Sequence, residues 1–304
     1  MPNVVFLLAP GVHLLDLAGP AQAFSSAADY GQDYTLHYVG EQEDVATTQG
    51  VPLKAMTTWP ELAADDLVVV PGWRARNTDG RARRKFGAAT LERLREHHGR
   101  GGTVASVCAG AFALGEAGLL DGRRCTTHHD LQDALASVYP HATVVRDVLY
   151  VVDGVVVTSA GIASGIDLAL HLLATRHGPG FAARIAREMV VYARRNGDEQ
   201  QDSAMLRHRS HVSDAVHRVQ DVIDARYGER LPLAELAAAG GVSERTLTRL
   251  FDRVIGLTPL RYQQLLRTER AEHLIGHGAT VEAAARAVGF EDARMLRRLR
   301  SRAT

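Results

Sequence analysis

The chain has 304 residues, of which 46% are hydrophobic, and its 35 basic residues balance its 35 acidic residues. This length allows two domains. No apolar run is long enough to span a membrane, and the opening residues MPNVVFLLAPG lack the charged segment of a signal peptide. We therefore expect a cytoplasmic protein that makes no membrane contact and begins with a β-strand.

The two cysteines, Cys108 and Cys125, are too few and too far apart to form a disulfide framework, and they fit a reducing compartment. The chain contains neither Cys-x-x-Cys nor His-Glu-x-x-His spacing. These are the spacings typical of metal and redox sites. The sequence therefore predicts neither a metal site nor a cofactor.

The balanced net charge conceals a split along the chain. Residues 1–202 hold 18 Lys and Arg against 23 Asp and Glu, a net charge of −5, whereas residues 203–304 hold 17 against 12, a net charge of +5. A basic carboxyl-terminal part suits contact with phosphate. The difference is small, so it supports a nucleic-acid partner only together with other features.

The first 190 residues alternate apolar, β-branched runs with helical patterns, which indicates an α/β domain with a flavodoxin-like parallel sheet and helices on both faces. Asp153-Gly154 is typical of the turn of a β-hairpin, and residues 47–58 suggest a short β-excursion. We place this domain at residues 1–193. The strands are expected at residues 4–9, 35–40, 67–72, 103–108 and 155–161, and the helices at residues 21–31, 89–99, 109–120, 130–140 and 164–178.

Cys108 directly follows an expected strand, and the small residues after it open a helix, which is the arrangement of a nucleophile elbow. A helix N-terminus at this point should lower the pKa of the thiol, and its N–H groups could hold an anion. The alternative is that Cys108 is a small buried hydrophobic residue, a common role for free cysteine. Cys125 has no activating neighbours and is expected to serve packing.

Six short motifs run through the first domain. They are Asp16-Leu-Ala-Gly-Pro20, Val70-Pro71-Gly72, Cys108-Ala-Gly-Ala, Gly118-Leu-Leu-Asp-Gly-Arg, Thr126-Thr127-His128 and Thr158-Ser-Ala-Gly-Ile. Together they resemble the PfpI-like branch of the class I glutamine amidotransferase fold, and more closely the sensor domain of AraC-family regulators that carry such a domain. The resemblance implies a pocket at the carboxyl ends of the strands.

In that superfamily the strand-end cysteine is the reactive residue, and an acidic residue of the first βα loop lies beside it. The resemblance assigns these places to Cys108 and Asp16. It adds Ala109 and His128 to the pocket. Relatives that hydrate isocyanides often have Thr where Ala109 stands, so the missing hydroxyl argues against hydratase activity. His129 stands where an aromatic residue is usual.

Residues 194–211 are polar and without a clear pattern, and we place a linker there. Residues 212–304 form the expected second, all-α domain. Within it, residues 231–262 indicate a helix-turn-helix. Ser243 is placed to cap its second helix, and the polar face of that helix presents Arg245, Thr248 and Arg249 to base edges in a major groove.

The same pattern recurs at residues 281–300, where Gly289 separates a short Ala-rich helix from an Arg-rich one. Arg294, Arg297 and Arg298 of the latter would reach base edges or grip phosphate. Two such units joined by one helix resemble the AraC family of transcription regulators. The residues that carry this resemblance are Leu236-Ala237, Val242-Ser243, Leu247, Leu250-Phe251, Thr258-Pro259, Arg267, Ala271 and Val288-Gly289-Phe290.

The second helix-turn-helix departs from the family pattern. The sequence stops at Thr304, where family members usually continue with a Gly-x-x-Pro segment and a final helix, and Arg300 falls where the pattern has a core aromatic residue. We therefore expect this unit to be truncated and to grip DNA weakly, with fast amide exchange over residues 291–304.

These features predict a transcription regulator that binds double-stranded DNA and senses a small-molecule effector. The resemblance implies a homodimer. One alternative is a Cys-dependent hydratase or amidase with an accessory DNA-binding domain, which Asp16 and Cys108 favour. Another is a dimerisation domain whose pocket binds nothing.

Overall fold

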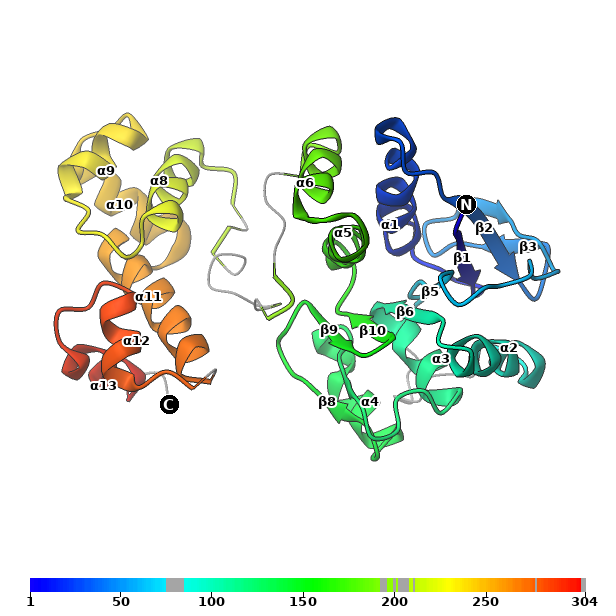
Figure 1. The fold of residues 1–304 in the computed structure, drawn as a ribbon. Coiled ribbons are helices and arrows are strands. Elements are labelled where there is room, and N and C mark those ends of the chain that lie inside the picture. Colours follow the sequence, from blue (N-terminus) through cyan, green and yellow to red (C-terminus); the bar gives the residue numbers. More distant parts are fainter. Residues whose placement is uncertain are drawn as a thin grey trace. The chain divides into compact units, whose positions relative to one another are not determined.

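The computed structural model describes residues 1–74, 85–191, 196–198, 201, 208–209, 211–276 and 278–301. The chain divides into two compact units, Met1–Gln201 and Asp202–Thr304 (Figure 1). Most of the predicted linker, residues 194–211, lies outside the described residues. Within it, Gly197 accepts a hydrogen bond of 2.8 Å from the Leu149 N–H, and Gln201 donates one of 2.9 Å to the Val148 carbonyl. The first unit therefore includes part of that segment.

The first unit is built on a six-stranded sheet in the order β2-β1-β5-β6-β10-β9. Its first five strands are parallel, and β9 pairs antiparallel with β10. Apolar runs such as LVVV in β5 are buried on both faces, as parallel strands require. The predicted parallel sheet and the hairpin turned at Asp153-Gly154 are confirmed. The strands are β1 (Asn3–Leu8), β2 (Thr35–Gly40), β5 (Leu67–Val70), β6 (Thr103–Val107), β9 (Tyr150–Asp153) and β10 (Val156–Ser159).

Helices cover both faces of this sheet, as predicted. In Figure 1, α1, α5 and α6 lie on one side, and α2 and α3 lie on the other. Two small ladders accompany the sheet, β3 (Asp44–Ala46) with β4 (Pro52–Lys54), and β7 (Arg124–Cys125) with β8 (Thr143–Val144). The helices are α1 (Leu14–Ser26), α2 (Ala88–Gly99), α3 (Ala111–Glu116), α4 (Gln132–Val138), α5 (Ser164–His177) and α6 (Pro179–Glu188), with short 3-10 turns η1 (Ala28–Tyr30), η2 (Cys108–Gly110) and η3 (His129–Leu131).

Two helices of the first unit differ most from the prediction, while α3 is shorter than the helix expected at residues 109–120. Helix α1 begins at Leu14, seven residues before the expected start, and runs through Pro20. Proline has no N–H to donate and normally disfavours a helix interior, which is why the sequence suggested a later start. Helix α6 was not predicted. Its signals were Gly178-Pro179, which ends α5 and starts a new helix, and the amphipathic run that follows.

The second unit is all-helical among its described residues, and it contains both predicted helix-turn-helix pairs. One apolar cluster, which includes Leu247, Phe251 and Tyr262, holds the first pair. Another, which includes Phe290, Leu296 and Leu299, holds the second pair. The helices are α8 (Asp214–Ala225), α9 (Leu233–Gly240), α10 (Glu244–Ile255), α11 (Pro259–Gly276), α12 (Val281–Ala287) and α13 (Ala293–Arg300). No helix among the described residues of the whole chain is long and apolar enough to cross a membrane.

The ends of α10 follow the capping signals of the sequence. The Ser243 hydroxyl accepts a hydrogen bond of 3.2 Å from the Thr246 N–H, which satisfies one of the unpaired donors of the first turn. Gly256 ends the helix with φ +70°, a left-handed conformation that glycine adopts without strain. Ser243 and Gly256 therefore fix where α10 begins and ends. Arg245 lies in the first turn, directly after the Ser243 cap.

Candidate functional site

Cys108 lies at a strained turn at the carboxyl end of β6. Its φ is +55°, in the left-handed region that non-glycine residues rarely enter, and its side chain is only 6% exposed. The following residues, Ala109 and Gly110, form η2 and lead directly into α3. The predicted strand–cysteine–helix elbow is therefore present, and it aims the thiol at the region where ligands bind in open α/β sheets.

Glycines leave the space that this turn needs. A Cβ atom on Gly72 would lie 2.4 Å from Asp16 Oδ2 and 2.7 Å from Cys108 Cβ. A Cβ atom on Gly161 would lie 2.4 Å from Cys108 Cβ. Because such contacts are far inside van der Waals distance, only glycine fits at either position. Cys108 is thus held between the ends of β5 and β10, with Asp16 beside it.

Asp16 is completely buried, in the first turn of α1. The prediction that it lies in the first βα loop is wrong, because α1 starts earlier than expected. Burial raises the pKa of this carboxyl group to about 7, and the nearby Gly72 N–H and Cys108 thiol oppose the rise only in part. Neither carboxyl oxygen has a hydrogen-bond partner of regular geometry among the described residues.

The pKa of the Cys108 thiol is raised, whereas the sequence predicted a lowered value. Burial is the main cause, and the neighbouring Asp16 carboxylate adds to it. The Ala109 N–H at the start of η2 acts in the predicted direction, but its effect is smaller. When two acidic groups are buried side by side, burial and charge repulsion prevent both from ionising at neutral pH. The Cys108–Asp16 pair therefore carries at most one negative charge.

A cavity of about 220 Å³ opens beside Cys108. Of the four residues expected in the pocket, Cys108 and His128 line this cavity, whereas Asp16 and Ala109 are fully buried and do not line it. Trp73 is 3% exposed, and its Nε1–H has no hydrogen-bond partner among the described residues. The sequence did not point to six further lining residues, because they meet only where the ends of β1 and β5 and later loops come together. They are His13, Trp73, Arg74, Asp130, Leu131 and Ile162.

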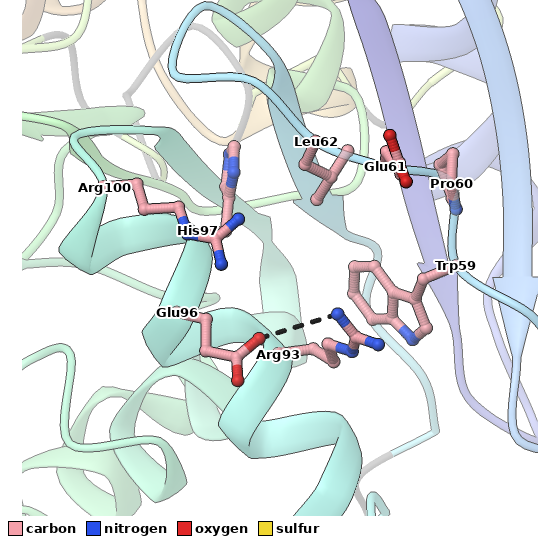
Figure 2. A pocket seen from close by; sticks show the side chains of 8 residues that line it. All are labelled: Trp59, Pro60, Glu61, Leu62, Arg93, Glu96, His97 and Arg100. Carbon is pink, nitrogen blue, oxygen red and sulfur yellow. Dashed lines mark ion pairs between the residues drawn. The ribbon is translucent and has the colours of Figure 1, made fainter.

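A larger cavity of about 390 Å³ lies between α2 and the segment before β5 (Figure 2). Its Arg93 and Glu96 side chains pair with each other at 3.6 Å, and His97 contacts the Thr103 carbonyl oxygen at 3.2 Å. It contains no cysteine and no strained residue. Size alone does not identify a site, and the smaller cavity has the strained cysteine that this one lacks, so the cavity at Cys108 is the better candidate.

Cys125 is fully buried, and both cysteines are free thiols. Burial raises the pKa of Cys125 to about 11, and Asp153 adds to this rise. Cys125 lines neither cavity described above. The interpretation of this residue as packing is consistent with that position.

The polar face of α10 presents Arg245 and Arg249 to solvent, four residues and about one turn apart. Neither guanidinium has an ion pair or hydrogen bond within the part of the chain that the structure describes. Thr248 lies between them, and its hydroxyl donates to the Glu244 carbonyl at 3.0 Å. Its oxygen can still accept a hydrogen bond, so the predicted trio forms one surface at the amino-terminal half of the helix.

The three arginines of α13 are less uniform. Arg294 pairs with Asp292 at 3.5 Å, and Arg297 pairs with Glu282 of α12. Arg298 is exposed and makes no side-chain ion pair among the described residues. A phosphate group would have to compete with an internal carboxylate for Arg294 and Arg297, but not for Arg298.

Arg267 of α11 joins the two helix-turn-helix pairs. Its guanidinium donates to the carbonyl oxygens of Tyr227 at 2.6 Å, Glu229 at 2.7 Å and Gly289 at 2.7 Å. Charged donors on carbonyl oxygens make strong hydrogen bonds. The loop before α9 and the turn of the second pair are therefore held to the same side chain, which fixes the spacing between the two pairs.

Paired helix-turn-helix units and a strand-end cysteine cavity define a DNA-binding transcription regulator built on an amidotransferase-like α/β domain. Residues 2–175 match the DJ-1/PfpI family, and residues 236–304 match a helix-turn-helix domain. The chain belongs to the DJ-1/PfpI family, and within it to the AraC-type regulators that carry this domain at the amino terminus.

Three relatives show the range of this similarity. CdhR of Pseudomonas aeruginosa, an HTH-type transcriptional regulator, is 30% identical over 276 residues, covering 89% of this chain and 79% of CdhR. Isonitrile hydratase of Pseudomonas putida is 36% identical over 174 residues, covering 56% of this chain and 70% of the enzyme. The crystal structure of an AraC family transcriptional regulator from Pseudomonas putida matches with a TM-score of 0.53 at 21% identity, covering 62% of this chain and 100% of that one. This last likeness is one of fold.

Proposed function

We propose that the protein regulates transcription in response to a small molecule that binds in the cavity beside Cys108. The observation that carries this proposal is the Trp73 indole N–H, a buried donor of the cavity lining without a hydrogen-bond partner among the described residues. A buried polar group without a partner costs about 1–3 kcal/mol. A ligand with an acceptor for Trp73 would recover part of that cost, which favours binding.

Arg245, Thr248 and Arg249 are proposed to read base edges in a major groove. They stand at the amino-terminal half of a capped helix, the part that reads bases in helix-turn-helix proteins. Arg298 is proposed to contact phosphate, because it is exposed and has no competing carboxylate partner among the described residues. Arg294 and Arg297 would join it after leaving Asp292 and Glu282.

Cys108 is proposed to serve sensing and not turnover. Ala109 supplies no hydroxyl next to the thiol, and burial disfavours the thiolate that a nucleophile needs. The similarity to isonitrile hydratase supports the opposite role, since that enzyme shares 36% identity with the first unit. CdhR, whose match covers 89% of this chain, is a regulator by name, which supports sensing.

The experiment that separates the two roles uses the full chain and an isonitrile as the substrate probe. We expect less than one formamide product per protein molecule, and we expect Cys108→Ser to bind DNA with unchanged affinity in the absence of effector. The DNA is chosen from a random-sequence library by the wild-type protein. Many turnovers of the isonitrile that are lost in Cys108→Ser would establish the enzyme instead.

A homodimer in the cytoplasm completes the proposal. The likeness of the first unit to sensor domains that usually pair supports the dimer. Sedimentation equilibrium of the full chain tests it, and a mass near twice 32.9 kDa is expected.

A further inference from the structure

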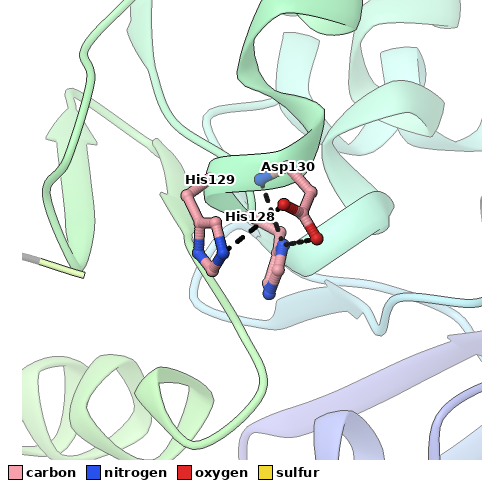
Figure 3. Close-up of side chains that lie close together, drawn as sticks. All are labelled: His128, His129 and Asp130. Atoms are coloured by element: carbon pink, nitrogen blue, oxygen red, sulfur yellow. Dashed lines mark hydrogen bonds and ion pairs between the residues drawn. The ribbon is translucent and has the colours of Figure 1, made fainter. Parts of the chain in front are cut away.

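Three consecutive residues, His128, His129 and Asp130, bring metal-binding atoms together at the edge of the Cys108 cavity (Figure 3). One ligand atom from each lies within 4.8 Å of the others. His128 Nδ1 is 3.8 Å from Asp130 Oδ2, and His129 Nε2 is 3.5 Å from Asp130 Oδ1. Each carboxylate oxygen therefore faces one imidazole. Among the described residues, no other group of three His, Cys, Asp or Glu side chains meets this distance.

The backbone explains how neighbours in sequence converge. His128 is extended, with φ −53° and ψ 140°, and the 3-10 turn η3 begins at the next residue. This change of direction turns the His129 ring back over the His128 ring, with ring centroids 4.1 Å apart. No recognised metal-binding spacing describes three adjacent residues. The expectation of no metal site rested on such spacings alone, so it did not weigh this group.

The chemistry of the group suits a divalent transition-metal ion. Two imidazoles and one carboxylate form an open set in which water or a ligand completes the coordination of Zn²⁺. At zinc–ligand distances of about 2.0–2.1 Å, tetrahedral ligand atoms lie about 3.3 Å apart. The present distances need only small side-chain rotations to reach this value. His129 and Asp130, with side chains 50% and 47% exposed, have room to make them.

One imidazole nitrogen faces a backbone donor. The Asp130 N–H donates to His128 Nδ1 at 3.3 Å, a geometry in which the lone pair of this nitrogen points into the group. A hydrogen bond of this length is weak and can be replaced by a metal ion. The competing interpretation is that His128 only caps η3 and that the His129–Asp130 contact is a surface ion pair.

We propose that His128, His129 and Asp130 bind one divalent ion of the zinc class. Because His128 and Asp130 also line the cavity, the ion stands at the edge of the space beside Cys108. The proposal goes beyond the regulator function above and does not depend on it, since metal binding is measured without DNA or effector.

The test is a titration of the untagged, metal-free full chain with Zn²⁺ in competition with a chromogenic chelator. We expect one tight site per chain. We expect His129→Phe and Asp130→Asn each to weaken Zn²⁺ binding at least about tenfold, because each removes a ligand. Co²⁺ should give the visible absorption of a low-symmetry four-coordinate site, and this absorption should be lost in both variants.

His141→Phe is the matched control, since His141 is an exposed histidine of the same unit outside the group. It should bind Zn²⁺ as wild type does. Both substituted ligands are about half exposed, so the variants should keep the wild-type Tm, which is measured in parallel. The proposal is overturned if the wild-type chain takes up no Zn²⁺ at equimolar concentration, if His129→Phe and Asp130→Asn bind as tightly as wild type, or if His141→Phe loses as much affinity as they do.

Discussion

At the scale of single residues, Cys108 and Asp16 are two acids in one buried place. The strained backbone of Cys108 and the glycines around it hold the thiol within reach of the carboxyl group, and burial raises the pKa of both. With the Asp16 pKa at about 7, the charge of the pair changes within the physiological range of pH. A ligand or a modification that prefers one protonation state of either acid would therefore shift the pKa of the other acid.

Asp16→Asn should change how stability depends on pH. Below about pH 4 both the folded and the unfolded chain keep the Asp16 proton, so the residue contributes nothing. Between about pH 4 and pH 7 only the unfolded chain loses the proton, so the folded state is progressively destabilised, by at most about 4 kcal/mol above pH 7. Asparagine removes this loss. The unfolding free energy of the first unit, relative to wild type, should therefore rise from pH 4 to pH 8.

Asp153→Asn is the control of opposite sign. The backbone N–H of Arg124 holds the pKa of Asp153 below its ordinary value, with Arg123 adding to the effect. That carboxylate therefore contributes stability at neutral pH that is lost as the pH falls through its folded pKa. Its replacement should lower stability at pH 8 relative to pH 3. A stability difference for Asp16→Asn that stays constant from pH 4 to pH 8 would refute the raised pKa.

Gly72→Ala should destabilise the first unit by about 1–3 kcal/mol, because the new Cβ would overlap Asp16 and Cys108. Gly99→Ala is the control. Gly99 ends α2 with no atom within 4 Å of an added Cβ, so alanine there should leave stability unchanged or raise it. Thermal unfolding of the two variants checks this, and equal Tm values would mean that the close approach at Gly72 is not tight.

The sequence predicts this site only in part. The strand, the small residues and Cys108 itself are local features, and they were predicted. The pKa of the thiol was not, because burial depends on packing between elements distant in sequence. Trp73 and His13 were missed for the same reason. They become neighbours only because β1 and β5 pair in parallel, and the His13 N–H donates to the Gly72 carbonyl at 2.9 Å.

At the scale of elements, helices α9 to α13 of the second unit follow their sequence signals more closely than the helices of the first unit, whereas α8 was not predicted. The caps of α10 at Ser243 and Gly256 are local, so sequence places both ends. Helix α1 starts at Leu14 and not at the expected residue 21, and the burial of Leu17 and Phe24 stabilises this longer helix. Local chemistry therefore predicts helix ends well where no tertiary contact opposes it.

Helix α13 is expected to exchange amide hydrogen fast, because its packing lacks one apolar anchor. Two of its side chains, Leu296 and Leu299, are buried, while Arg300 pairs with Glu272 at 3.5 Å in place of an aromatic contact. Burial of one large apolar side chain stabilises a fold by about 1.5–3 kcal/mol, and α13 lacks that stabilisation at Arg300. We predict that residues 293–300 exchange amide hydrogen faster than residues 244–255 of α10, as measured by mass spectrometry on the free chain. Equal protection of the two helices would show that α13 is docked as firmly as α10.

At the scale of the whole molecule, the chain combines an acidic first unit, which contains the cavity beside Cys108, with a basic second unit that binds DNA. The first unit, Met1–Gln201, holds 18 Lys and Arg against 22 Asp and Glu, and the second, Asp202–Thr304, holds 17 against 13. Net charges of −4 and +4 agree with this division, although the specific contacts carry more weight than the charge. Arg267 fixes the spacing of the two helix-turn-helix pairs within the second unit. We propose that the exposed Arg245 and Arg249 of α10 make the first pair the main reader of sequence.

The most direct test of this claim is a binding titration of the full chain, at fixed salt, on DNA selected by the wild-type protein. Arg245→Ala and Arg249→Ala should each cost about 1–3 kcal/mol on that DNA, a loss of about 5- to 150-fold, and much less on random DNA. Arg93→Ala, which removes an equal charge from α2 of the first unit, should bind as wild type does. If both α10 variants keep wild-type affinity and sequence preference, α10 does not read DNA and the account is contradicted.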